Sequence, residues 1–159
     1  MVTKIDVYLN KEEDFYSQFR DTKLSKDLFS YILEECYGEN VNNDIEITFY
    51  SNFKIIKDRQ EKMIDALRRC YGLRVQDEEY YLKRTMIREL LLFGGGVLFL
   101  LGYYLLTTVK FFSEFILILG WLSIWESVYS FLFDQLEKKM FIKRLKRIAR
   151  AKINFVQGK

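Results

Sequence analysis

Two segments in the first third of the chain alternate apolar and polar side chains. Residues 5–9 and 45–49 carry isoleucine, valine, leucine or phenylalanine at every second position. A period of two puts these apolar side chains on one face of an extended strand. The pattern therefore predicts two half-buried strands, and Asn42-Asn43 marks a turn before the second one.

Helical spacing appears next to these strands. Asn10, followed three residues later by Glu13, predicts a capping box that opens a short helix over residues 11–19. Ser25 is the expected N-cap of a second helix. Gly38 is the expected left-handed stop of that second helix.

A longer amphipathic helix is predicted over residues 53–71, with Gly72 as its stop. Residues 1–76 then form a small α+β head with the order β-α-α-β-α. Two strands seldom make a stable sheet alone, so two alternatives stay open. Either residues 73–76 add a third strand, or the head pairs with another copy or another protein. Residues 77–88 predict a helical stalk, because no Gly or Pro interrupts them.

A nearly unbroken apolar block covers residues 89–133, with four charged positions in 45 residues. A membrane crossing takes about 20 residues, so the block has room for two crossings and a short turn. We therefore expect a transmembrane helical hairpin with crossings at 89–109 and 112–133. Residues 134–159 are too few for a second domain, and their basic and apolar side chains at helical spacing predict a basic amphipathic helix.

Charge differs between the two parts of the chain. Residues 1–85 hold 14 Lys and Arg against 17 Asp and Glu, whereas residues 86–159 hold 11 against 5. Basic residues flank the apolar block at both ends, and the turn inside it has only Lys110, which Glu114 neutralises. The first residues also lack the pattern of a secretory signal. The positive-inside rule therefore predicts a multi-pass cell-membrane protein with both termini in the cytosol.

Small and polar residues recur inside the hairpin at helical spacing. In the second crossing they form a heptad-like stripe, with Glu126 on the same face, and folding the hairpin at residues 110–111 sets Glu126 level with Gly95. This polar seam consists of Ser123, Glu126, Ser127, Ser130, Gly95 and Gly102. One interpretation is a packing seam, in which serines hydrogen-bond across the helix contact. The other is a site at Glu126, because an ionisable group at that depth costs a few kcal/mol.

The basic C-terminal segment is expected to lie on the anionic inner leaflet, where each cation contributes about 1 kcal/mol. The expected lipid-binding residues are Lys138, Lys139, Lys143, Arg144, Lys146, Arg147 and Arg150. Basic clusters also bind nucleic acid, but the neighbouring crossing makes lipid the simpler partner. In a third interpretation, the apolar face of this segment packs against the head and its cations steady the bundle.

The chain offers few residues for catalysis. It has no histidine, and it lacks the phosphate-binding, dinucleotide-binding and nucleophile-elbow motifs. Cys36 and Cys70 lack metal-ligand spacing, so we expect small buried side chains and no disulfide. The carboxylates of the head occupy predicted helix starts and exposed faces, where solvation explains them. We therefore expect no catalytic residue, no metal and no cofactor.

These features predict a non-enzymatic integral membrane protein whose cytosolic head binds a protein partner or self-associates at the inner leaflet. The alternative is an oligomeric membrane-perturbing or ion-conducting effector, gated by the head, with Glu126 in a pore-lining stripe. A third hypothesis is a membrane-bound enzyme whose site in the head is marked by no familiar motif.

Overall fold

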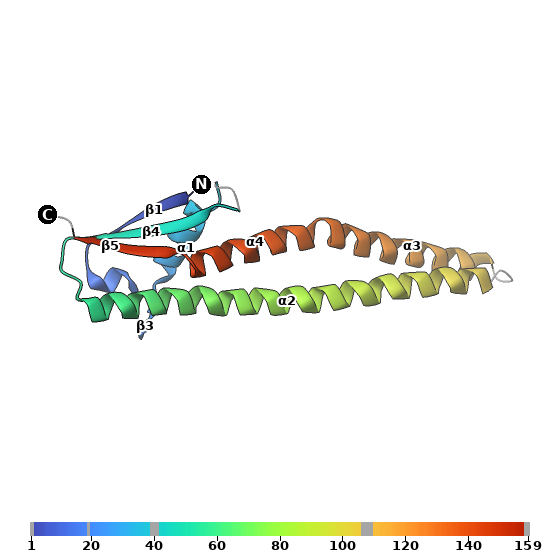
Figure 1. Cartoon of the computed structure of the whole chain (residues 1–159). Helices are drawn as coiled ribbons and strands as arrows, with labels where there is room; N and C mark the ends of the chain where they lie inside the picture. Colours follow the sequence, from blue (N-terminus) through green and yellow to red (C-terminus); the bar gives the residue numbers. More distant parts are fainter. Residues whose placement is uncertain (1, 19, 39–41, 106–109, 158–159) are drawn as a thin grey trace. The chain divides into compact units, whose positions relative to one another are not determined.

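The computed structural model describes residues 2–18, 20–38, 42–105 and 110–157 (Figure 1). The chain divides into two compact units: Met1–Asp77 with Phe141–Lys159, and Glu78–Met140. We call the first unit the head and the second the hairpin, and each is described by itself. The predicted head ends at residue 76, but the observed head also contains the described residues from Phe141 onward, which were predicted to form a separate tail.

The head contains one sheet of three parallel strands in the order β1-β4-β5 (Figure 1). Strands β1 (Val2–Leu9) and β4 (Asp44–Ser51) are the two predicted from alternation. The third strand is β5 (Lys152–Gln157), so the prediction that residues 73–76 supply it is wrong. The Phe155 ring of β5 stacks on Phe49 of β4 with ring centroids 5.4 Å apart, and this contact helps to hold the third strand in register.

The segment after β1 differs from its prediction. The expected helix over residues 11–19 is only a short 3₁₀ turn, η1 (Glu12–Asp14), followed by the antiparallel strands β2 (Tyr16–Ser17) and β3 (Arg20–Leu24). The Asp14 carboxylate accepts hydrogen bonds from the backbone N–H groups of Asn10 and Lys11, at 3.2 and 2.9 Å. Asp14 therefore caps this turn from its far end, in place of the capping box expected from Asn10.

Helix α1 (Lys26–Glu35) begins as predicted, because the Ser25 hydroxyl accepts a hydrogen bond from the Leu28 N–H at 3.2 Å. Its expected left-handed stop at Gly38 is wrong, since no described residue has a positive φ. Helix α2 (Lys57–Leu105) likewise continues through Gly72 and includes the predicted stalk. Glycine inside a helix costs about 1 kcal/mol. Burial of Tyr71 and Val75 on either side of Gly72 offsets that cost.

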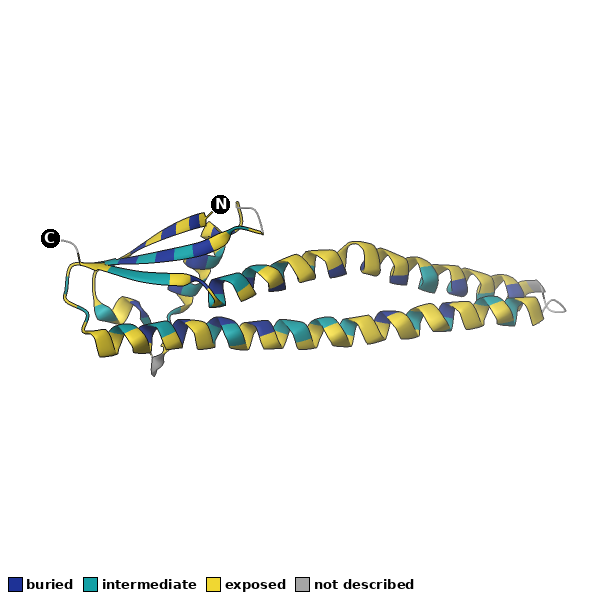
Figure 2. Cartoon of the chain, in the orientation of Figure 1, coloured by how far each residue is buried: buried dark blue, intermediate teal, exposed yellow. Residues whose placement is uncertain are grey.

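One hydrophobic core fills the inward side of the sheet. The strands contribute Ile47 and Phe49, and the helices contribute Ile32 of α1, Leu67 of α2 and Leu145 of α4 (Asp134–Ala149), all of them buried. Figure 2 shows buried and exposed residues alternating along β1, and mainly buried and half-buried residues alternating along β4. The outward side chains of the strands lie on the opposite, uncovered face.

The C-terminal segment is not one amphipathic helix. Helix α4 ends at Ala149, and β5 follows it in the head. The apolar side chains Ile142, Leu145 and Ile148 of α4 are buried in the head core. This finding agrees with the third interpretation of the segment, packing against the head. The alternating Ile153 and Phe155 belong to the strand pattern, which the many neighbouring cations obscure in the sequence.

The hairpin contains the second part of α2, helix α3 (Lys110–Leu132) and the start of α4. Its two apolar stretches are long and apolar enough to cross a membrane. Only 11% of the first apolar stretch and 17% of the second are buried. A core helix of a water-soluble protein would be mostly buried. The hairpin therefore has a large apolar surface that its own packing leaves uncovered.

Truncation of Leu145 is expected to destabilise the head by about 2–5 kcal/mol, because this side chain is 0% exposed. The matched control is Leu136→Ala, on the same helix but 56% exposed, which is expected to cost less than about 1 kcal/mol. Thermal unfolding of the full chain in detergent measures both changes. Equal losses for Leu145→Ala and Leu136→Ala would contradict the packing of α4 in the head.

Tyr71 makes the stability of the head sensitive to alkaline pH. Burial, followed by the nearby Cys36 and Cys70, raises the pKa of the Tyr71 phenol well above 10.0, and its hydroxyl donates to the Phe29 carbonyl at 2.9 Å. Because folding raises the pKa of the Tyr71 phenol, the stability that the protonated phenol gives to the fold is complete below pH 10. That stability is lost as the pH rises further. Tyr71→Phe is expected to cost about 1 kcal/mol at pH 8, and its difference from wild type is expected to shrink towards pH 11.

Urea unfolding of the full chain in detergent at several pH values measures this difference. The control is Tyr8→Phe at an exposed phenol, which is expected to stay within about 0.5 kcal/mol of wild type. A constant difference between wild type and Tyr71→Phe across this pH range would show that ionisation of Tyr71 does not limit the fold.

Candidate functional site

Helices α2 and α3 of the hairpin approach each other closely at Gly96 and Gly120. A Cβ atom added to Gly96 would lie 3.0 Å from the Gly120 carbonyl oxygen and 2.7 Å from Ile124 Cγ1. The predicted seam glycines lie elsewhere on the helix. A Cβ added to Gly95 meets nothing within 4 Å, and one added to Gly102 comes only within 3.9 Å of Ile116. The close approach is therefore one residue away from the predicted position.

The serines of the predicted seam divide between two roles. Ser127 is buried, and its hydroxyl donates to the Glu89 carbonyl of α2 at 2.9 Å, while Ser130 is buried one turn later. Ser123 instead donates to the Leu119 carbonyl of its own helix at 2.8 Å. Glu126 is exposed. The six seam residues therefore do not form one continuous face of contact, and Glu126 lies outside the packing between α2 and α3.

The most deeply buried charged residue among the described residues of the hairpin was not predicted from the sequence. Glu89 is 3% exposed, and its Oε1 pairs with Arg88 through Nη2 at 2.6 Å and Nε at 3.2 Å. Its Oε2 has no hydrogen-bond partner among the described residues. Glu89 precedes Gly96 by seven residues, or about two helical turns, so it shares the face that contacts α3. The spacing of Glu89 and Gly96 could have indicated this burial from the sequence. Glu89 is the first residue of the apolar block, however, so it was interpreted only as the boundary of the first crossing.

Glu89 and Gln135 line one cavity of about 450 Å³ in the hairpin. Gln135 is 2% exposed, and its Oε1 also lacks a hydrogen-bond partner among the described residues. The other lining residues are mostly apolar: Met86, Ile87, Leu90, Phe93, Ser127, Val128, Phe131 and Leu132. We call this the hairpin cavity. It combines an apolar wall with two buried oxygen atoms that are able to accept hydrogen bonds.

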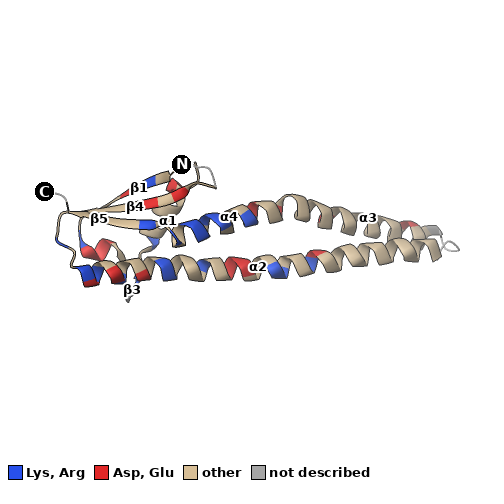
Figure 3. Ribbon diagram, in the orientation of Figure 1, with Lys and Arg blue, Asp and Glu red and all other residues tan. Residues whose placement is uncertain are grey.

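Two of the expected lipid-binding cations contact residues of the head. The Lys143 ammonium donates to Asn42 Oδ1 at 2.7 Å, and the Arg144 guanidinium lies 4.6 Å from the centre of the Tyr37 ring. Figure 3 shows the Lys and Arg residues along α4. The exposed cations of α4 are Lys139, Lys143 and Lys146, and the half-buried ones are Lys138, Arg144 and Arg147. Arg150, which follows the helix, is exposed. Binding of lipid by these residues stays a prediction.

The uncovered face of the head sheet is the second notable surface. Tyr8, Tyr50 and Val156 occupy one register row across the three strands. The Tyr8 and Tyr50 rings stack with centroids 5.0 Å apart, and Tyr8 is 74% exposed. Parallel sheets usually have both faces covered, so an open face with an aromatic row is unusual. We call it the open sheet face.

A charged row crosses the same face four residues nearer the start of the strands. Lys4, Glu46 and Lys152 are register partners, and the Lys152 ammonium lies 3.3 Å from Glu46 Oε1. Asn154 donates to the same oxygen at 2.7 Å. The hydrogen bond from Asn154, with the hydrogen bond and charge of Lys152, lowers the pKa of the Glu46 carboxyl below its usual value. Glu46 therefore stays negatively charged between two lysines.

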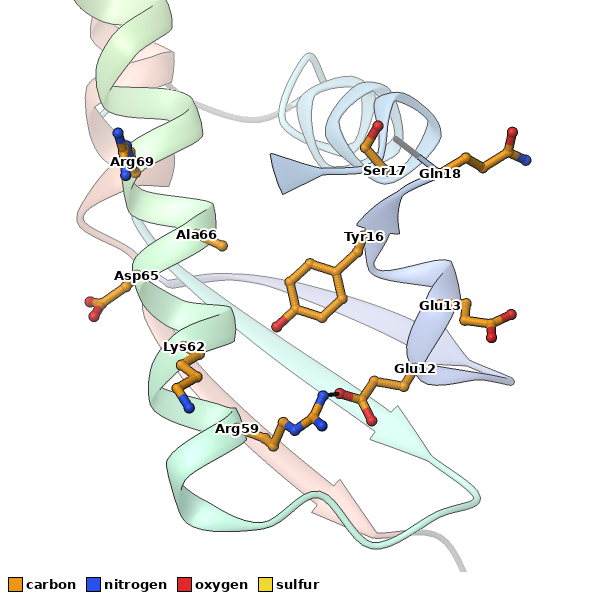
Figure 4. Close-up of a pocket in the computed structure, with 10 residues that line it drawn as sticks. All are labelled: Glu12, Glu13, Tyr16, Ser17, Gln18, Arg59, Lys62, Asp65, Ala66 and Arg69. Atoms are coloured by element: carbon orange, nitrogen blue, oxygen red, sulfur yellow. Dashed lines mark hydrogen bonds and ion pairs between the residues drawn. The ribbon is translucent and has the colours of Figure 1, made fainter. Parts of the chain in front are cut away.

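The head also has a polar groove of about 930 Å³ beside α2. Figure 4 shows its lining, with Glu12 and Arg59 joined in an ion pair and the Tyr16 ring turned towards α2. Its acidic residues Glu12, Glu13 and Asp65 are matched in number by its basic residues Arg59, Lys62 and Arg69. No group of three metal-ligating side chains occurs among the described residues. This groove therefore presents balanced charge and no clustered ligand set.

Comparison with protein-family models, with curated protein sequences and with solved structures gives no match to this chain. The function is therefore inferred from the surfaces described above.

The contact at Gly96 generates a test of the hairpin packing. Gly96→Leu is expected to destabilise the hairpin by about 1–3 kcal/mol, because its side chain would enter the space of Ile124 and the Gly120 backbone. Gly94→Leu is the matched control, since a Cβ at Gly94 meets nothing within 4 Å. Thermal melting in detergent compares the two variants. Equal melting temperatures would show that α2 and α3 do not pack at Gly96.

Proposed function

We propose that this protein is a non-enzymatic membrane protein, inserted through its hairpin, whose cytosolic head binds a protein partner through the open sheet face. The observation that carries the proposal is the aromatic row of Tyr8 and Tyr50 on an uncovered parallel sheet. Exposed aromatic residues are frequent anchors of protein interfaces.

The apolar surface of the hairpin supports insertion into a membrane. Large apolar side chains cover the outside of both spans and are exposed, among them Leu90, Leu91, Leu105, Phe111 and Trp121. Such a surface is unstable in water unless lipid or protein covers it. Lipid is the simplest cover for two helices of this length.

The sheet topology supports the proposed placement of the two chain ends. Strand β1 precedes the hairpin and β5 follows it, and both pair with β4 in one sheet. A hairpin that crosses a membrane twice would return the chain to the side from which it left. The basic residues beside the apolar block favour the cytosolic side, according to the positive-inside rule.

The charges of the open sheet face favour a different protein over a second copy. If two such faces pair about a twofold axis along the strands, Lys4 of one copy meets Lys152 of the other, and Glu46 meets Glu46. If the twofold axis instead runs across the strands, along the row that contains Asp6 and Thr48, Asp6 of one copy meets Asp6 of the other. Like charges in contact are unfavourable at an interface. A partner with an apolar anchor and mixed charges fits this face better.

The ion-conducting alternative receives less support from the geometry. A pore-lining stripe needs its polar residues on one open face, but Ser127 and Ser130 are buried, whereas Glu126 is exposed. The balanced charges of the polar groove likewise give little support to an enzyme in the head.

Tyr8→Ala is expected to weaken the complex with the partner about 30-fold, which corresponds to a contribution of about 2 kcal/mol from one interface anchor. The control is Leu73→Ala on α2, another exposed apolar residue of the head, which is expected to leave binding unchanged. Full-length protein is purified from its native membranes, and the amount of each co-purifying chain is compared among the three forms. A partner recovered equally with Tyr8→Ala would show that the open sheet face is not the interface.

A further inference from the structure

The hairpin cavity presents two buried acceptor atoms that nothing in the described chain satisfies. Glu89 Oε2 and Gln135 Oε1 both belong to residues that are no more than 3% exposed, and both residues line the cavity. A buried acceptor without a donor costs about 1–3 kcal/mol, and more when it carries charge. A ligand that brings N–H donors into the cavity would recover this free energy.

The charges near the cavity favour a cation. Arg88 pairs with Glu89, and the carboxylates of Glu126 and Asp134 also interact electrostatically with Arg88. Among these four side chains, three carboxylates interact with one guanidinium, so the positive charge of Arg88 is shared among three negative charges. Arg88 is itself exposed, so it is accessible to an anionic group beside the cavity.

The remaining walls favour an apolar chain attached to that cation. Leu90, Phe93, Phe131 and Leu132 line the cavity and are also exposed on the surface of the hairpin. An apolar chain lying along them would cover these side chains. The cavity lies at the end of the apolar stretches that carries Lys83, Arg84, Lys138 and Lys139. In a membrane this end would lie at the level of the lipid headgroups.

We propose that the hairpin cavity binds the primary ammonium group of an amphiphile, which donates hydrogen bonds to Glu89 and Gln135 while its apolar chain lies along Phe93 and Phe131. An aminophospholipid of the bilayer and a free long-chain amine both have this chemistry. In the phospholipid, the phosphate would lie beside Arg88. This site goes beyond the proposed function, because the cavity belongs to the hairpin and the partner surface belongs to the head.

The test measures ligand binding to the full chain in a nonionic detergent by native mass spectrometry. Phosphatidylethanolamine is compared with phosphatidylcholine of the same acyl chains, and dodecylamine with dodecyltrimethylammonium. The trimethylated member of each pair keeps the positive charge but has no N–H donor. In at least one pair, wild type is expected to bind the primary ammonium compound about tenfold more tightly, or better, than the trimethylated compound. Hydrogen bonds to a charged group contribute a difference of that size.

Glu89→Gln is expected to reduce this preference, because an amide oxygen accepts a weaker hydrogen bond from an ammonium group than a carboxylate does. Gln135→Leu is expected to reduce it as well, because it removes the second acceptor. The matched control is Glu114→Gln, an exposed carboxylate of α3 outside the cavity, which is expected to keep the full preference. Preference within the phospholipid pair alone identifies a bilayer lipid as the source, and preference within the amine pair alone identifies a free amphiphile. Either result supports the site.

Equal binding of the two members of both pairs by wild type would overturn the proposal, and this comparison needs no variant. Full preference in Glu89→Gln, with circular dichroism like that of wild type, would also overturn it. If Glu89→Gln fails to fold, Gln135→Leu takes its place, and retention of the full preference by that variant has the same meaning.

Discussion

The pairing of β4 with β5 is the constraint on which the rest of the molecule depends. These parallel neighbours lie far apart in sequence, because β4 ends at Ser51 and β5 begins at Lys152. Parallel strands need a crossover connection, usually one helix, but here the connection contains α2, α3 and α4. The hairpin is therefore an insertion in the crossover of a small sheet. The connection that contains the hairpin begins after β4 and ends before β5, and these two strands are hydrogen-bonded neighbours in one sheet.

This arrangement explains why a segment so rich in cations folds back into the head. Ile142, Leu145 and Ile148 provide the apolar face that the sheet needs on its inward side, and the cations of α4 remain near the surface. Lys143 and Arg144 then contact Asn42 and Tyr37. Basic amphipathic helices are typical of membrane surfaces, but the same pattern suits a helix that covers a sheet. The sequence pattern alone does not distinguish these two partners.

The elements with local signals were predictable, and the elements that depend on distant contacts were not. Alternation in β1 and β4, the Ser25 cap of α1 and the apolar block of the hairpin all appear within a few neighbouring residues. Gly72 was mistaken for a helix stop, because its cost is offset only by packing of Tyr71 and Val75 in the core. In the candidate site, the burial of Ser127 was foreseeable from its spacing. Glu89 and Gln135 were not, since their burial depends on how α2 and α3 meet.

The position of β5 after the hairpin also sets an order of events during biosynthesis. The ribosome makes β1 and β4 first, then both apolar helices, and only afterwards the strand that completes the sheet. Domains begin to fold while the chain is still being made, but this head lacks one strand and one covering helix until the hairpin has emerged. A hairpin that enters a membrane during synthesis would therefore be inserted before the head is finished. In newly made chains, the head would therefore be completed on a hairpin that is already anchored.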